Sequence, residues 1–113
     1  MLTLESLRAL GVNVEEGLQR CINNETFYFR LVEKAIRDPA FDELRDAAES
    51  GDLDRGFALA HALKGVTANL ALTPLSVPIG EITELFRART ETDYRPLVAA
   101  VIAKRDELLS LLS

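Results

Sequence analysis

The stretch from Leu53 to Leu72, LDRGFALAHALKGVTANLAL, decides the fold, because its apolar residues recur at helical rather than alternating spacing. On a helix with about 3.6 residues per turn, the large apolar side chains gather on one side. That side is the predicted core stripe of the helix. It consists of Leu59, Leu63, Val66 and Leu70, with Leu53, Ala60 and Thr67 at its edges.

The single histidine of the chain, His61, lies well outside this stripe. Its predicted helical neighbours at i−3, i+4 and i+7 are Ala58, Gly65 and Ala68, and Lys64 follows it at i+3. A glycine inside a helix costs about 0.5–1 kcal/mol relative to alanine, so Gly65 suggests that something approaches the backbone there. The pattern predicts an exposed imidazole among small residues.

Helical spacing continues on both sides of this stretch. A helix is predicted from about Glu25 to Gly51, with Asp38 and Pro39 marking a kink or a stop and restart. Asp52 is the expected N-cap of the central helix. After the sequence TPLS another helix is expected over about 75–88, its first turns weakened by Pro78 and Gly80.

The two ends of the chain also carry helix signals. Thr3 can cap a short first helix that Gly11 ends, and Asn13 with Glu16 forms a capping-box pattern for a helix to about Ile22. The last predicted helix starts after Thr92 or Asp93, with Pro96 in its first turn. The sequence therefore predicts an all-α fold, an antiparallel up-down four-helix bundle with short additional N-terminal helices, as one domain over residues 1–113.

Composition narrows the classes of function. The formal net charge is −5 and the lysines and arginines are scattered, which opposes a nucleic-acid or membrane surface. With one cysteine, Cys21, and one histidine, no zinc set or Cys/His nucleophile pair is expected, and no glycine-rich phosphate loop is present. We expect a cytoplasmic monomer that binds no cofactor or metal itself and acts on a protein or a small molecule.

The residues around His61 are those that phosphoryl transfer to a side chain needs. The imidazole is a nucleophile, Lys64 is a cation near it, and the small neighbours leave room for a partner. Simpler interpretations stay open, because a lone exposed histidine is usually only solvated. Gly65 could also serve close helix packing inside the bundle.

The segment Ala60–Leu70, AHALKGVTANL, resembles the signature of histidine-containing phosphotransfer (HPt) domains, His-x-Leu-Lys-Gly followed by a small residue and an Asn-Leu pair. Leu44, Ala47, Gly51 and Asp52 extend the resemblance upstream in weaker form. The chain departs from the family at Ala71, where glycine is common, at Ile82 and Thr83, where Leu-Glu is frequent, and at Pro78 and Gly80, which are atypical of the helix after the active one.

The resemblance implies a role for each matching residue. His61 would be phosphorylated, Lys64 would assist electrostatically, and Gly65, with Ala58 and Ala68, would leave room for a docking receiver domain. The partners would be response-regulator receiver domains, which would supply Mg²⁺, and a hybrid or separate histidine kinase. The solvent-facing ring nitrogen, Nε2, is the expected attacking atom.

The main hypothesis is therefore a phosphorelay intermediate without kinase activity of its own. One alternative is a helical adaptor that docks a receiver without transferring phosphate. Another is a detached substrate domain phosphorylated by a separate ATP-binding kinase. An independent enzyme ranks last, because sequence spacing places no second acid or base beside His61, and Glu84 or Arg87 could approach only through the tertiary fold.

Overall fold

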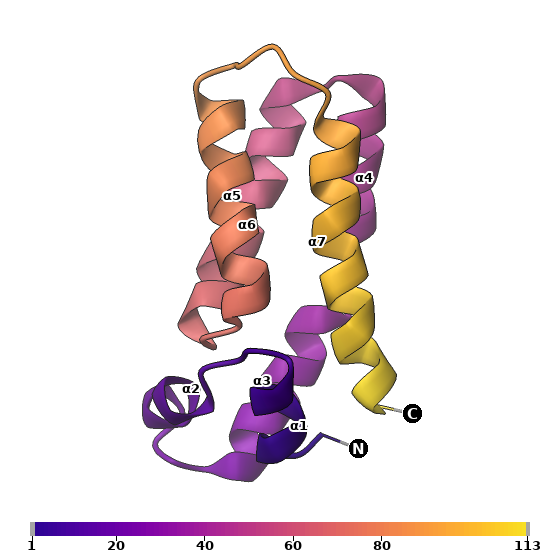
Figure 1. Cartoon of the computed structure of the whole chain (residues 1–113). Helices are drawn as coiled ribbons and strands as arrows, with labels where there is room; N and C mark the ends of the chain where they lie inside the picture. The colour runs from indigo at the N-terminus through magenta and orange to yellow at the C-terminus, as the bar shows by residue number, and fades with distance from the viewer. Residues whose placement is uncertain (1, 113) are drawn as a thin grey trace.

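The computed structural model describes residues 2–112, so the ends of the predicted domain at 1 and 113 lie outside the described residues. Within 2–112 every regular element is helical, which confirms the predicted all-α class (Figure 1). No described helix has the length and apolar character needed to cross a membrane. In chain order the elements are α1 (Leu4–Ala9), α2 (Val14–Arg20), α3 (Glu25–Ile36), α4 (Ala40–Ser50), α5 (Leu53–Asn69), α6 (Thr73–Arg87), α7 (Tyr94–Leu109) and the 3₁₀ helix η1 (Ser110–Leu112).

Helices α4 to α7 run up and down beside one another and form the bundle (Figure 1). Helix α5 packs against α4 and α6, and α7 closes the bundle by packing against the same two helices. The short α1 and α2 lie at one end of the bundle, next to α3. This arrangement places α5 between two neighbours and leaves one long side of it free.

Most predicted helix ends are confirmed by their caps. Thr3 and Asp52 each accept a hydrogen bond from the backbone N–H three residues on, at 2.9 and 3.1 Å. Asn13 accepts one from the N–H of Glu16 at 3.3 Å. Asp93, rather than Thr92, caps α7. Gly51 ends α4 with a left-handed φ of 73°, which glycine adopts without steric cost.

One predicted boundary had two open outcomes, a kink or a stop and restart at Asp38 and Pro39, and two other boundaries differ from the sequence prediction. Asp38 and Pro39 produce a stop and restart, since Ala40 donates to the Asp38 carboxylate at 2.9 Å before α4 begins. Helix α2 ends at Arg20 rather than Ile22, because Ile22 has a left-handed φ of 51°. Helix α6 starts earlier than predicted, at Thr73. The backbone carbonyl of Leu72 accepts hydrogen bonds of 2.9 Å from the N–H groups of Leu75 and Ser76, which form the first turn.

The predicted core stripe of α5 was partly wrong. Leu63, Leu70, Ala60 and Thr67 are buried, but Leu59 and Leu53 are only half-buried and Val66 is 42% exposed. The buried side of α5 includes Gly56. A Cβ at this position would lie 2.5 Å from the Phe86 ring of α6, so only a glycine fits where the two helices approach each other. Close approach of α5 and α6 at Gly56 thus decides which side of α5 is buried.

The N-terminal helices hold the C-terminal end of α5. The last carbonyls of a helix lack partners within the helix and need other donors. Here the Arg20 guanidinium donates to the Ala68 carbonyl at 2.6 Å, and the Tyr28 hydroxyl donates to the Leu70 carbonyl at 2.9 Å. The backbone N–H of Asn13 donates to the Ala71 carbonyl at 3.1 Å. The segment before the bundle therefore fixes the end of the helix that carries His61.

The buried Tyr28 predicts a loss of stability at alkaline pH. Burial raises the pKa of Tyr28 to about 12, and the charges of Cys21 and Glu15 act in the same direction. The protonated phenol therefore stabilises the fold fully below the unfolded-state pKa of about 10, and this contribution is lost as pH rises from about 10 toward 12.

We expect wild type to exceed Tyr28→Phe in free energy of unfolding by about 1 kcal/mol at pH 8, since the variant lacks the hydrogen bond to Leu70. The gap should narrow above pH 10, because the variant has no phenol to ionise at this position. Urea unfolding of both proteins at pH 8, 9, 10 and 11 measures this difference in free energy of unfolding. The buried Tyr94, whose pKa burial also raises, is common to both proteins. A gap that is constant with pH would contradict the prediction.

Candidate functional site

His61 lies near the middle of α5, on the free side of the helix, and its side chain is exposed. Within residues 2–112 neither ring nitrogen has a hydrogen-bond or ion-pair partner. The imidazole is instead stacked on the Phe57 ring one turn earlier, with the ring centroids 5.5 Å apart and the planes 18° apart. Both nitrogens are thus free to react, while one contact holds the ring.

The surface beside His61 carries little side-chain bulk. Ala58, Gly65 and Ala68, predicted to clear the space around the imidazole, are all exposed. A Cβ built on Gly65 would meet nothing within 4 Å, beyond its own helix and chain neighbours. Gly65 therefore does not serve close packing inside the bundle, in contrast to Gly56.

Lys64 lies across the junction of α5 and α6. Its side chain is half-buried, and a Cβ on Gly80 of α6 would lie 3.6 Å from the Lys64 Cε and 3.9 Å from its Cδ. The aliphatic stem of Lys64 therefore passes over Gly80 at ordinary van der Waals distance. Lys64 forms no ion pair with any residue of the described chain, so its charge is available to an incoming anion.

Glu84 and Arg87, the two residues that the tertiary fold could bring near His61, pair with each other. The Arg87 Nε donates to the Glu84 carboxylate at 3.1 Å. The Arg87 guanidinium also lies 4.9 Å from the centroid of the Phe57 ring. Glu84 is therefore paired with Arg87 on α6. Arg87 contacts Phe57, which in turn stacks on His61.

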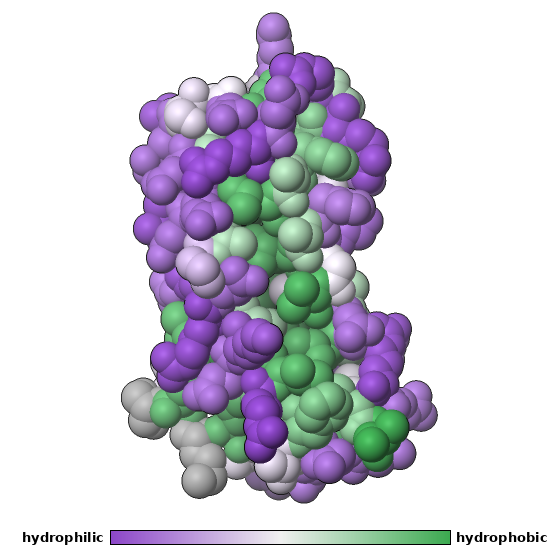
Figure 2. Space-filling model, turned by 180° about the vertical axis from the view of Figure 1, so that it is seen from behind, coloured by the Kyte–Doolittle hydropathy of each residue, from purple (hydrophilic) through white to green (hydrophobic). Residues whose placement is uncertain are grey.

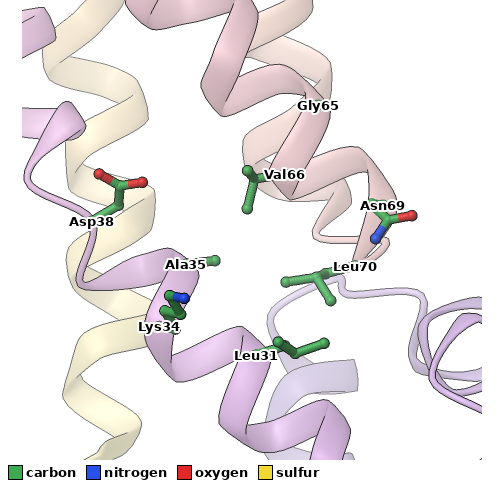
Figure 3. Close-up of a pocket in the computed structure, with 8 residues that line it drawn as sticks. All are labelled: Leu31, Lys34, Ala35, Asp38, Gly65, Val66, Asn69 and Leu70. Atoms are coloured by element: carbon green, nitrogen blue, oxygen red, sulfur yellow. The ribbon is translucent and has the colours of Figure 1, made fainter.

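A groove opens on the other side of Gly65, between α3 and α5. It has a volume of about 540 Å³. In Figure 3 Val66 of α5 and Leu70, which directly follows this helix, point toward Leu31 and Ala35 of α3 across this gap. Figure 2 shows the molecule from behind, with hydrophobic residues gathered in a band down the middle of that face. We call this hollow the α3–α5 groove; its lining is Leu31, Lys34, Ala35, Asp38, Gly65, Val66, Asn69 and Leu70.

The sequence analysis missed Phe57 and the α3 side of the groove. A signal for Phe57 was present, because residues at i and i+4 of a helix are neighbours and both side chains are aromatic rings. The contribution of Leu31 and Ala35 depends on how α3 crosses α5, which periodicity within one helix does not give.

The comparison with protein families matches residues 34–112 to the Hpt domain, more than half of the chain. The chain belongs to the Hpt domain family. Hpt domains are phosphotransfer modules of two-component phosphorelays that lack kinase activity and interact with receiver domains and histidine kinases. The comparisons with curated proteins and with solved structures gave no match.

The Hpt match begins inside α3 and runs to the end of η1. It therefore includes the whole bundle and the α5 motif, while α1, α2 and most of α3 lie before it. The α3–α5 groove crosses this limit, since Val66 lies in the matched region and Leu31 lies before it. Of the residues that line the groove only Leu31 precedes the matched region, whereas Lys34, Ala35 and Asp38 on the same side fall within it.

Proposed function

We propose that this Hpt domain accepts a phosphoryl group on His61 from the aspartyl-phosphate of one receiver domain and passes it to the aspartate of another. The observation that carries the proposal is the exposed imidazole of His61, without a polar partner in the described chain and bordered by Gly65 with empty space beyond it. A receiver aspartate lies in its own domain, so the histidine must reach out to it.

The proposed step is a displacement at phosphorus. The lone pair of a neutral imidazole nitrogen, Nε2 in our proposal, attacks the phosphorus atom, the N–P bond forms, and the P–O bond to the receiver carboxylate breaks. The carboxylate leaves with the electron pair, and the proton stays on the other ring nitrogen. The receiver would supply Mg²⁺ and this chain the nucleophile.

The docking surface in this proposal consists of Ala58, Gly65 and Ala68 together with the mouth of the α3–α5 groove. A domain that covers Gly65 also covers Val66, which is 42% exposed and lines the groove. Burial of such apolar surface contributes favourably to association. The small residues would let the receiver approach His61, and the groove would provide the adjoining apolar contact.

The proposal is tested with purified receivers of the source genome, each labelled with phosphate and mixed with this protein. We expect label on this protein within seconds to minutes from a subset of receivers, and none from ATP and Mg²⁺ alone. A kinase with ATP is the parallel arm. Binding of receivers without transfer would favour the adaptor, and labelling only by a kinase would favour the detached substrate domain; either result would overturn the proposal.

Lys64 is proposed to stabilise the charge that develops on the phosphoryl group. A cation near that charge contributes on the order of 1–3 kcal/mol, so Lys64→Met should slow transfer roughly ten- to hundredfold. Methionine keeps the aliphatic stem over Gly80, so the melting temperature should hardly change.

Single-turnover transfer from a phosphorylated receiver measures this rate, and thermal unfolding of the same samples is the control. Lys64→Arg, which keeps the charge, should retain more of the rate than Lys64→Met. Equal rates for wild type and Lys64→Met would show that Lys64 is a solvated surface residue.

A further inference from the structure

The imidazole of His61 is held by an aromatic stack rather than by a hydrogen bond. Its ring lies 5.5 Å from the Phe57 ring, centroid to centroid, with an interplanar angle of 18°. These values fall in the range of offset-stacked aromatic pairs. Histidines that act as nucleophiles or bases are usually oriented by a polar group on the second ring nitrogen, and no residue in the described part of the chain provides one.

Phe57 is itself fixed from the neighbouring helix. Its side chain is half-buried between α5 and α6, and the Arg87 guanidinium lies 4.9 Å from its ring centroid, within cation–π range. Arg87 is in turn held by the Glu84 carboxylate at 3.1 Å. The stack therefore connects the exposed imidazole to α6, and the orientation of His61 depends on two helices rather than on one.

The direction of the contact suits a nucleophile. The lone pair of an imidazole nitrogen lies in the plane of the ring, whereas Phe57 covers a face of that ring. A face contact restricts rotation of the side chain but leaves the edge, with both nitrogens, open to an approaching phosphorus atom. Fewer orientations of the free side chain mean that a larger fraction of molecules is ready for in-line attack.

We propose that Phe57 is the positioning residue for His61, with Arg87 holding Phe57 in place. This inference rests on the proposed phosphorylation of His61, and it deepens that proposal by naming how the nucleophile is oriented. Phe57 lies outside the His-x-Leu-Lys-Gly segment that carries the family resemblance.

The first test reads the stack directly, without phosphate or receiver. A proton over an aromatic face experiences a ring-current shift, and His61 is the only histidine in the chain, so its imidazole signals are unambiguous in an NMR spectrum. We expect the imidazole protons of the wild type to be shifted upfield. Phe57→Leu should move them to random-coil positions, Phe57→Tyr should restore the shift, and Arg87→Gln should reduce it.

The second test reads the consequence for reactivity. Phe57→Leu should lower the rate of labelling by phosphoramidate, a small donor that needs no docking surface, by about three- to tenfold. The limiting single-turnover rate from a phosphorylated receiver should fall by a similar factor, while the receiver concentration that gives half the limiting rate stays the same. Phe57→Tyr should restore both rates. The matched control is Phe27→Leu, the same change at an exposed phenylalanine of α3.

Each result supports or overturns the inference. Wild-type imidazole signals that Phe57→Leu leaves unmoved, or labelling rates that it leaves unchanged, would overturn it. A fall confined to the receiver reaction, with a raised half-saturating concentration, would also overturn it and make Phe57 a docking residue. If no receiver transfers phosphate but phosphoramidate labelling depends on Phe57, the positioning role stands and the proposed function fails.

Discussion

We expect His61→Gln to abolish the formation of acid-labile, alkali-stable phosphate on this protein. His61 is the only histidine, so no second imidazole can take over the reaction. Glutamine is also polar and prefers helix about as well as histidine does. The imidazole is exposed and has no hydrogen-bond partner in the described chain, and its replacement removes only the stack on Phe57, so the free energy of unfolding should change by no more than about 1 kcal/mol.

The measurement is label retained after transfer from a phosphorylated receiver, with acid and alkali treatment of the product. Thermal unfolding of the variant is the control, and Lys64→Met shows how a slowed but competent site behaves. Label at the wild-type level in His61→Gln would place the phosphate on another side chain and remove the basis of the proposed mechanism.

The sequence was sufficient for the fold class and for the local ends of helices. Capping residues such as Asp52 and Asp93 accept hydrogen bonds from backbone groups two or three residues away, so a short stretch of sequence is enough to predict their effect. The helix that carries His61 was predicted for the same reason. The exposure of His61 followed from helical geometry alone.

The details that failed depend on how helices pack against each other. The pattern of large apolar residues predicted that Val66 is buried. In the structure α5 contacts Phe86 at Gly56, and the buried side of the helix carries smaller residues such as Ala60, while Val66 is exposed. Phe57 was overlooked because its significance comes from Arg87, which lies 30 residues later in the chain and meets it only in the folded bundle. The α3–α5 groove likewise exists only through the crossing of two helices.

Ala71 shows a departure from the family that the structure makes concrete. Where Hpt domains commonly have glycine, this alanine adopts a left-handed φ of 56° and is buried. Its carbonyl accepts the hydrogen bond from Asn13, so the N-terminal segment holds the turn after α5 in this conformation. The hydrogen bond from Asn13, which lies before the matched region, therefore supports Ala71 in a backbone conformation that a glycine would adopt without strain.

Gly65→Leu should leave the protein folded and at least as stable, yet slow transfer from a receiver by roughly a hundredfold or more. Nothing within 4 Å would obstruct a Cβ at this position, and leucine favours helix over glycine by up to about 1 kcal/mol. A bulky side chain one turn from His61 would instead meet the docking receiver. A clash that raises the activation free energy of transfer by about 3 kcal/mol lowers the rate roughly a hundredfold.

Gly56→Ala is the matched control, because it adds a side chain to the same helix on the buried side. A Cβ there would lie 2.5 Å from the Phe86 ring, so we expect the variant to lose about 1–3 kcal/mol of stability. For Gly65→Leu, phosphoramidate should still label His61, since a small donor avoids the added bulk. If Gly65→Leu melted several degrees lower and lost labelling by both donors, the open side of α5 would have a structural role, and the receiver-docking surface would have to lie elsewhere.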